Sequence, residues 1–192
     1  MNVSVSELTN AVLMLLDENR VLLETRITYC DPGTDLISLV RRLLPEAARL
    51  ESAEAEAGDI SEGLPIEATL SYDADGVATA RLPADFMRLL YLRMSDWSDG
   101  LTQTVPAAQV PLLRASARRR SGRRHRGIHL RHGGDGRVLD IYGSLPGAVI
   151  AEASYLPRPE IAGDSIFIPS SLVERVARRA AAYVREILTH NN

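Results

Sequence analysis

The sequence predicts an α+β fold in which a small helical bundle, formed by N- and C-terminal helices, carries an inserted antiparallel β-hairpin region. Three observations support this prediction. Apolar residues recur at helical spacing near both ends of the chain, and turn signals between alternating apolar residues occupy the middle. The apolar content of 45% includes only two Phe and one Trp, which suits a core of aliphatic residues from helices packed on a modest sheet.

At 192 residues the chain has the length of a single domain. We expect residues 1–63 to hold the N-terminal helices and residues 64–163 to form the β-rich insertion. Residues 168–190 should form a C-terminal helix that packs on the N-terminal helices. The insertion contains an arginine-rich segment, residues 114–127.

The N-terminal part contains two helix signals. Ser4 and Glu7 have the spacing of a capping box, and the helix that they begin should end near Asn19. After a turn at 31–33, a second helix is predicted from about Asp35 to Leu50, with apolar residues along one face. Pro45 lies inside this helix and should bend it or divide it in two.

The next segments change from helix to strand. Residues 51–63 are acidic and poor in large apolar groups, which predicts a frayed helix end and a loop. Segments 68–72 and 77–82 flank the turn-rich residues 73–76 and predict a hairpin. The same turn resembles the start of a calcium loop, but the remaining ligands at the required spacing are missing. The apolar run 87–94 fits either a strand or a helix, and we favour a strand.

The second half of the insertion repeats this pattern. Residues 103–117 should carry a short helix before the arginine-rich segment. Segments 128–131 and 137–143 are separated by a glycine-rich turn and predict a second hairpin, and 148–156 predicts a further strand. Pro157-Arg158-Pro159 should close the sheet region.

The C-terminal helix has the strongest periodicity in the chain. Ser171 and Glu174 again have capping-box spacing. The apolar stripe that follows contains Leu172, Val173, Val176, Ala180, Val184, Ile187 and Leu188. The opposite face is expected to carry Arg175, Arg178, Arg179 and Arg185.

Charge is distributed unevenly along the chain. Residues 1–100 carry 8 Arg and 18 acidic residues, whereas residues 101–192 carry 14 Arg and 7 acidic residues, and there is no Lys. Such a chain can associate head to tail with copies of itself, or bind an acidic and a basic partner at once. The longest apolar run is too short to span a bilayer and no basic segment precedes it, so we expect a soluble, unsecreted protein without a membrane partner. The single cysteine, Cys30, excludes an internal disulfide.

The arginine-rich segment 114–127 is the clearest candidate for partner contact. The residues concerned are Arg114, Arg118, Arg119, Arg120, Arg123, Arg124 and Arg126. These side chains can pair with carboxylates of a neighbouring subunit, or bind nucleic-acid phosphates without reading sequence, because no aromatic residues are interleaved for base stacking. A solvated loop without a partner is the third interpretation.

No catalytic signature is present in the sequence. We find no nucleophile elbow, no phosphate-binding glycine loop before a helix and no HExxH motif. His125, His129 and His132 lie close together, but strand geometry would place His129 and His132 on opposite faces, which disfavours a metal site. We therefore expect a protein that is not an enzyme and that binds no cofactor or metal.

Several short segments resemble a known class of protein. Leu82, Pro83, Asp85, Phe86, Arg88 and Leu89 match an LPxDFxRL segment, and Met94, Ser95, Asp96 and Trp97 match the xMSDW end that follows it. An LDEN-like stretch (16–19), LLPEAAR (43–49), YLPxPxI (155–161) and a closing helix (168–184) occur in the same order. Together these segments resemble head-tail adaptor, or connector, proteins of tailed bacteriophages and prophages of the gut Bacteroidales type.

This resemblance implies a structural role in a virion. It implies a subunit of a homo-oligomeric ring that docks beneath the portal protein, contacts tail proteins and continues the channel through which DNA leaves the head. The protein would then be found in the virion, and in the host cytoplasm during assembly. The dense arginine cluster at 118–126 departs from the resemblance, so whether it contacts the DNA backbone, a neighbouring subunit or nothing stays open. The alternative function is a sequence-independent nucleic-acid-binding module that uses residues 114–126.

Overall fold

The computed structural model describes residues 1–18, 35–60, 62–117, 125–134 and 136–190. The chain divides into two compact units, which we name the helical unit (Met1–Glu62 with Pro159–Asn192) and the β unit (Gly63–Arg158). The mixed α+β class is as predicted. No described helix is long and apolar enough to cross a membrane.

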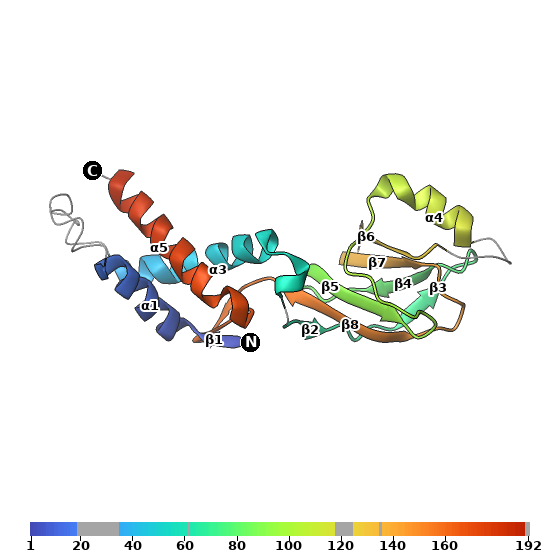
Figure 1. Ribbon diagram of the computed structural model, residues 1–192, viewed down its shortest axis with the longest axis horizontal. Coiled ribbons are helices and arrows are strands. Elements are labelled where there is room, and N and C mark those ends of the chain that lie inside the picture. The colour runs from blue at the N-terminus through green and yellow to red at the C-terminus, as the bar shows by residue number, and fades with distance from the viewer. Residues whose placement is uncertain (19–34, 61, 118–124, 135, 191–192) are drawn as a thin grey trace. The chain divides into compact units, whose positions relative to one another are not determined.

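The helical unit is built on three helices, α1 (Val5–Glu18), α3 (Leu36–Glu54) and α5 (Val173–His190), which contact one another (Figure 1). The predicted cap of α1 is present, because the Ser4 hydroxyl accepts a hydrogen bond from the Glu7 amide at 3.2 Å. The start of α3, predicted near Asp35, is capped by the Asp35 carboxylate, which accepts from the Ile37 amide at 3.1 Å. Pro45 does not divide α3, and the helix continues to Glu54, past the end predicted at Leu50.

The start of α5 differs from the prediction. The helix is entered through a 3₁₀ turn, η3 (Ser170–Leu172), which has no side-chain cap at its start. The Ser170 hydroxyl donates instead to Glu62, at 2.7 Å. The buried stripe of α5 consists of small residues and valine, namely Val176, Ala177, Ala180, Ala181 and Val184. Small side chains allow the backbones of neighbouring helices to approach closely.

A small antiparallel sheet in the helical unit was not predicted. It has the order β1 (Asn2–Ser4), β10 (Ser165–Phe167), β9 (Ile161–Ala162). The strands β9 and β10 show that Pro157-Arg158-Pro159 does not end the extended structure, and that β9, inside the predicted insertion 64–163, belongs to the helical unit. The first and last quarters of the chain are thus joined by backbone hydrogen bonds as well as by helix packing.

The β unit contains two antiparallel sheets rather than a region of separate hairpins. The first sheet has the order β2 (Leu64–Pro65), β8 (Ile150–Pro157), β5 (Phe86–Met94). The second has the order β3 (Leu70–Tyr72), β4 (Ala78–Arg81), β7 (Gly136–Tyr142), β6 (Gly127–Gly133). The strand predicted at 87–94 and both predicted hairpins are confirmed.

The inner faces of the two sheets share one hydrophobic core. Phe86, Leu92 and Met94 from β5 pack in the same buried cluster as Leu139 and Ile141 from β7. The predicted short helix is also present, as α4 (Val110–Ala117), preceded by a 3₁₀ turn (Ala107–Gln109); Figure 1 shows it beside the second sheet. Leu113 of α4 packs with Val77 and Tyr142 in a smaller cluster.

The calcium-loop-like residues 73–76 form the turn between β3 and β4. The Asp73 carboxylate accepts hydrogen bonds from the amides of Asp75 and Val77, both at 2.9 Å. Gly76 has φ of +78°, a conformation that glycine adopts without strain. The Asp73-x-Asp75-Gly76 pattern is therefore accounted for by the hydrogen bonds of the turn itself.

Candidate functional site

Arg114 forms the N-terminal boundary of the arginine-rich segment and is tied to the β unit. It lies in the last turn of α4, where its guanidinium is 3.9 Å from the Asp73 carboxylate and 3.8 Å from that of Asp75. The neighbouring Tyr142 hydroxyl raises the pKa of Arg114 most, and these two carboxylates raise it further. Burial raises the pKa of Tyr142, which therefore lies beside the guanidinium as a neutral phenol.

Arg126 forms the other boundary, and it is held by the only tryptophan of the chain. Its guanidinium lies 5.7 Å from the centre of the Trp97 ring and donates to the Ser98 hydroxyl at 3.3 Å. Such a cation–π contact contributes about 0.5–1 kcal/mol at an exposed site. Trp97 is itself 3% exposed, and its indole N–H donates to the Gly143 carbonyl at 3.4 Å.

The backbone at this boundary is also fixed. The His125 amide donates to the Ser116 hydroxyl at 2.9 Å, which links the start of β6 to the end of α4. Gly143 has φ of +83°, and a Cβ there would lie 2.6 Å from the His125 carbonyl oxygen. Only glycine allows the chain after β7 to pass this close to His125 and Arg126.

Two of the seven candidate arginines, Arg114 and Arg126, are thus placed by contacts within the β unit. The other five, Arg118, Arg119, Arg120, Arg123 and Arg124, lie outside the described residues. The five are flanked on both sides by anchored residues that are joined to each other through the Ser116–His125 hydrogen bond. The described residues on either side of this stretch, Ser116 and His125, are therefore held together on the β unit.

Segments that carry the resemblance to phage adaptors, LPADF and YLPRP, meet each other in the β unit. The Tyr155 hydroxyl donates to the Asp85 carboxylate at 3.0 Å, and the ring of Tyr155 stacks on Phe86 with 5.6 Å between centroids. The Arg158 amide donates to the Asp85 carbonyl at 2.6 Å. Burial, together with the hydrogen bond to Asp85, raises the pKa of Tyr155 to about 12.

The Ser95-Asp96-Trp97 segment supports a neighbouring loop, residues 143–149. The Ser95 hydroxyl accepts from the Val149 amide at 3.1 Å, and the Asp96 carboxylate accepts from the Leu145 amide at 2.7 Å. Together with the Trp97 bond to Gly143, these contacts hold both ends and the middle of the loop. The side chains of Leu145 and Val149 are 53% and 61% exposed, so the loop presents apolar surface to solvent.

An ionic cluster between α3 and α5, centred on the buried Glu51, was not predicted from the sequence. The Glu51 side chain is 7% exposed and lies 2.5 Å from Nε of Arg179 and 2.8 Å from Nε of Arg175. Arg179 also pairs with Glu54 at 2.5 Å. Arg175, Arg178 and Arg179 lie off the buried stripe of α5, as predicted, but Arg175 and Arg179 pair with Glu51 of α3. Arg185 donates to the Leu15 carbonyl at 2.9 Å.

The positions of these residues in the sequence carry a signal for the cluster. Glu51 lies four residues after Ala47 and three after Ala48, on the buried stripe of α3, and Arg175 and Arg179 are one helical turn apart on α5. Residues 51–63 were expected to be a frayed end and loop because their composition is acidic. Position on the stripe, rather than composition, identifies Glu51 as buried.

The three histidines do not come together as metal ligands. His129 lies on β6 with Nδ1 3.0 Å from the Val105 carbonyl oxygen, and His132 is three residues further along the same strand, on the opposite face. Within the described residues, no group of three or more His, Cys, Asp or Glu side chains is placed to hold a metal ion.

Comparison with known proteins adds no family: no family model matches the chain, and no curated protein matches it.

Proposed function

We propose that this chain is a structural subunit of a tailed-phage or prophage virion, a head-tail adaptor that assembles as a ring between the portal and the tail and continues the DNA channel. The observation that carries the proposal is the mutual contact of the segments on which the resemblance rests. Asp85 and Phe86 from LPADF bind Tyr155 from YLPRP, and the SDW residues hold the 143–149 loop. These residues support architecture, as expected of an assembly protein.

The arrangement of elements supports the finer description as well. Adaptors of this kind resemble a small helical bundle with a β insertion. Helices α1, α3 and α5 contact one another, and the β unit occupies the sequence between α3 and α5. The two-sheet β unit is a larger insertion than hairpins alone.

The distribution of charge between the units supports assembly into a ring. The helical unit contains 9 Arg and 16 acidic residues, and the β unit contains 13 Arg and 9 acidic residues. In a cyclic ring each interface is heterologous, so different surfaces of two neighbouring subunits meet. An acidic unit and a basic unit in the same chain provide complementary surfaces for such a contact.

The proposal is tested by co-expressing the full chain with a portal protein and a tail protein of the same phage or prophage. We expect the chain to copurify with the portal ring and to appear as an added ring in electron micrographs. A chain that stays apart from both the portal and the tail proteins would refute the proposal. The mass of the chain alone, measured by light scattering at low and high salt, then shows whether a ring forms before docking.

A nucleic-acid-binding module is the second candidate, because residues 118–124 add five arginines between two anchored ones. Two variants distinguish the candidates: replacement of Arg118, Arg119, Arg120, Arg123 and Arg124 by Ser, and by Lys. Non-specific DNA binding should be lost with Ser and retained with Lys, since it depends on charge. Bidentate contact with subunit carboxylates should be weakened by both replacements. Retained DNA affinity in the Ser variant would exclude the second candidate.

A further inference from the structure

The loop between β7 and β8, residues 143–149, holds apolar side chains at the surface of the β unit. The side chains of Leu145 and Val149 are 53% and 61% exposed, and Pro146, between them in the sequence, is exposed as well. In the described part of the β unit, the other large apolar side chain with this degree of exposure is Leu112 of α4, at 73%. Single exposed apolar residues are ordinary on protein surfaces, whereas several together mark an interaction site.

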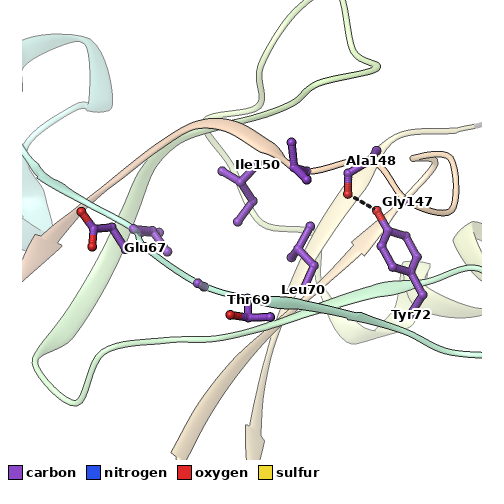
Figure 2. Close-up of a pocket in the computed structure, with 10 residues that line it drawn as sticks. Glu67, Thr69, Leu70, Tyr72, Gly147, Ala148 and Ile150 are labelled. Carbon is purple, nitrogen blue, oxygen red and sulfur yellow. Dashed lines mark hydrogen bonds between the residues drawn. The ribbon is translucent and has the colours of Figure 1, made fainter.

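The loop is fixed along its length by hydrogen bonds. The Ser95-Asp96-Trp97 segment bonds to both ends and to the middle of the loop. Within the loop, the Ala148 amide donates to the Leu145 carbonyl at 3.0 Å. The Tyr72 hydroxyl donates to the Ala148 carbonyl at 2.6 Å, as Figure 2 shows. The exposed side chains are therefore carried by a preorganised backbone, and a partner that binds them pays little to order the loop.

A groove of about 530 Å³ opens beside α4. Its apolar lining includes Val105, Leu112 and Leu113, and its basic groups are His125 and Arg126, both of which are exposed. Among the described residues that line it, none is acidic. The groove therefore suits an apolar side chain that is accompanied by a carboxylate.

The loop carries the charge that matches this groove. The exposed Asp96 accepts a hydrogen bond from the Leu145 amide at 2.7 Å, so a carboxylate lies next to the exposed leucine. Among the described residues, no cation pairs with Asp96 and no carboxylate pairs with Arg126, whose contacts are the Trp97 ring and the Ser98 hydroxyl. A leucine beside an acid on the loop is thus complementary to an apolar lining beside an arginine in the groove.

The two surfaces adjoin in one chain but do not cover each other there. A Cβ on Gly143, where the loop begins, would contact the carbonyl oxygen of His125, which lines the groove. Leu145 and Leu112 nevertheless both remain more than half exposed, so the loop leaves the groove of its own chain open. The surface that complements each of them is present on a second copy.

We propose that two copies of this chain bind each other through these surfaces, with the 143–149 loop of one copy seated in the groove beside α4 of the other. Leu145 packs against Leu112 and Val105, and the Asp96 carboxylate pairs with Arg126. The contact joins two different surfaces, so it can be repeated from copy to copy or made twice within one pair. This inference does not depend on the proposed virion function.

Two variants of the full chain test the contact by complementation. Leu145→Arg alters the loop and Leu112→Asp alters the groove, each at an exposed position, and each places a charge opposite a like charge of the other copy. In sedimentation equilibrium we expect the unaltered chain to self-associate with a Kd below about 0.5 mM, and each variant alone to associate at least about tenfold more weakly. An equimolar mixture of the variants should recover association to within about fivefold of the unaltered chain, because the intact loop of one meets the intact groove of the other.

Met14→Asp is the matched control, because it places a charge at a side chain of the helical unit that is 67% exposed, and it should leave association unchanged. Absence of self-association up to about 1 mM would overturn the proposal. Unchanged association in either single variant, an equal loss in the Met14 variant, or a mixture of folded variants that stays dissociated would overturn it too.

A further variant tests the charge pair. Asp96→Asn keeps an oxygen that accepts from the Leu145 amide and removes only the charge. It should weaken association about threefold at low salt and have little effect at high salt, because the pair lies at the rim of the contact. Equal association of Asp96→Asn and the unaltered chain at low salt would overturn the assignment of Arg126 as the partner of Asp96.

Discussion

Replacement of Glu51 by alanine tests whether the buried ionic cluster holds α3 and α5 together. The carboxylate is 7% exposed and lies within 2.8 Å of two guanidinium groups. Removing one partner of a buried ion pair costs about 3–5 kcal/mol, because the remaining charge is left without compensation. Arg175 is 46% exposed and Arg179 is 25% exposed, so water can solvate them in part. We therefore expect Glu51→Ala to lower the free energy of unfolding by about 3 kcal/mol.

Glu54→Ala is the matched control. Glu54 lies on α3, as Glu51 does, and pairs with the same Arg179, but the side chain of Glu54 is 52% exposed. Exposed ion pairs contribute about 0–1 kcal/mol, so this variant should lose no more than about 1 kcal/mol.

Urea unfolding of both variants, followed by circular dichroism at 222 nm, measures the difference in stability. The fluorescence of Trp97 serves as a second signal, because this residue lies in the β unit. Equal losses in the Glu51 and Glu54 variants would refute the reasoning that burial makes Glu51 the important partner.

Three further predictions concern other parts of the chain. Gly143→Ala should destabilise the β unit by about 2 kcal/mol or more, because Gly143 has a positive φ and an added Cβ would collide with the His125 carbonyl oxygen. Urea unfolding followed by Trp97 fluorescence measures this loss, and a loss below about 0.5 kcal/mol would contradict the prediction. Tyr155→Phe should reduce the loss of stability between pH 10 and pH 12, as measured by thermal unfolding. The folded pKa of Tyr155, about 12, exceeds the reference value of 10.0, so the stability that Tyr155 contributes is complete below pH 10 and disappears as the pH rises through 12. An unchanged pH profile would show that Tyr155 titrates normally. Hydrogen bonds from the N-terminal amine and Ser170 lower the pKa of Glu62 from 4.5, so Glu62→Gln should destabilise the helical unit at pH 7. The difference in stability between the two proteins should narrow as the pH falls through the lowered pKa, and a difference that stays constant down to pH 2 would argue against these contacts.

Local signals in the sequence predicted the elements of the fold well. The β3–β4 turn is determined by Asp73 and Gly76, and the starts of α1 and α3 by Ser4 and Asp35, all through contacts within a few residues. Such contacts depend on local sequence, so they can be recognised without a structure.

Long-range pairings were the part that the sequence could not provide. The strand β1 exists because Val3 pairs with Ile166, more than 160 residues away, and three residues alone carry no strand signal. Pro45 remains inside one helix because tertiary packing of α3 outweighs its local effect. The two-sheet organisation of the β unit depends on one segment, 64–73, pairing with different strands at its two ends.

The candidate site stays a prediction, and the structure adds the contacts of two of its residues. The sequence identified the arginine-rich segment, and the structure shows that Arg114 and Arg126 are anchored by Asp73, Asp75 and Trp97. The sequence alone could not pair Arg126 with Trp97, since 29 positions separate them, nor Asp85 with Tyr155 across 70.

The pairing of β2 with β8 has a consequence for how this protein can diversify. The chain enters the β unit through β2 and leaves it through β8, and Leu64 lies directly opposite Tyr155 across this strand pair. The two points where the inserted sequence begins and ends are therefore close together, which is the arrangement that tolerates domain insertion and removal. Recombination could replace residues 63–158 with another cassette while the three helices keep their connections, so that new binding surfaces evolve on an unchanged helical scaffold.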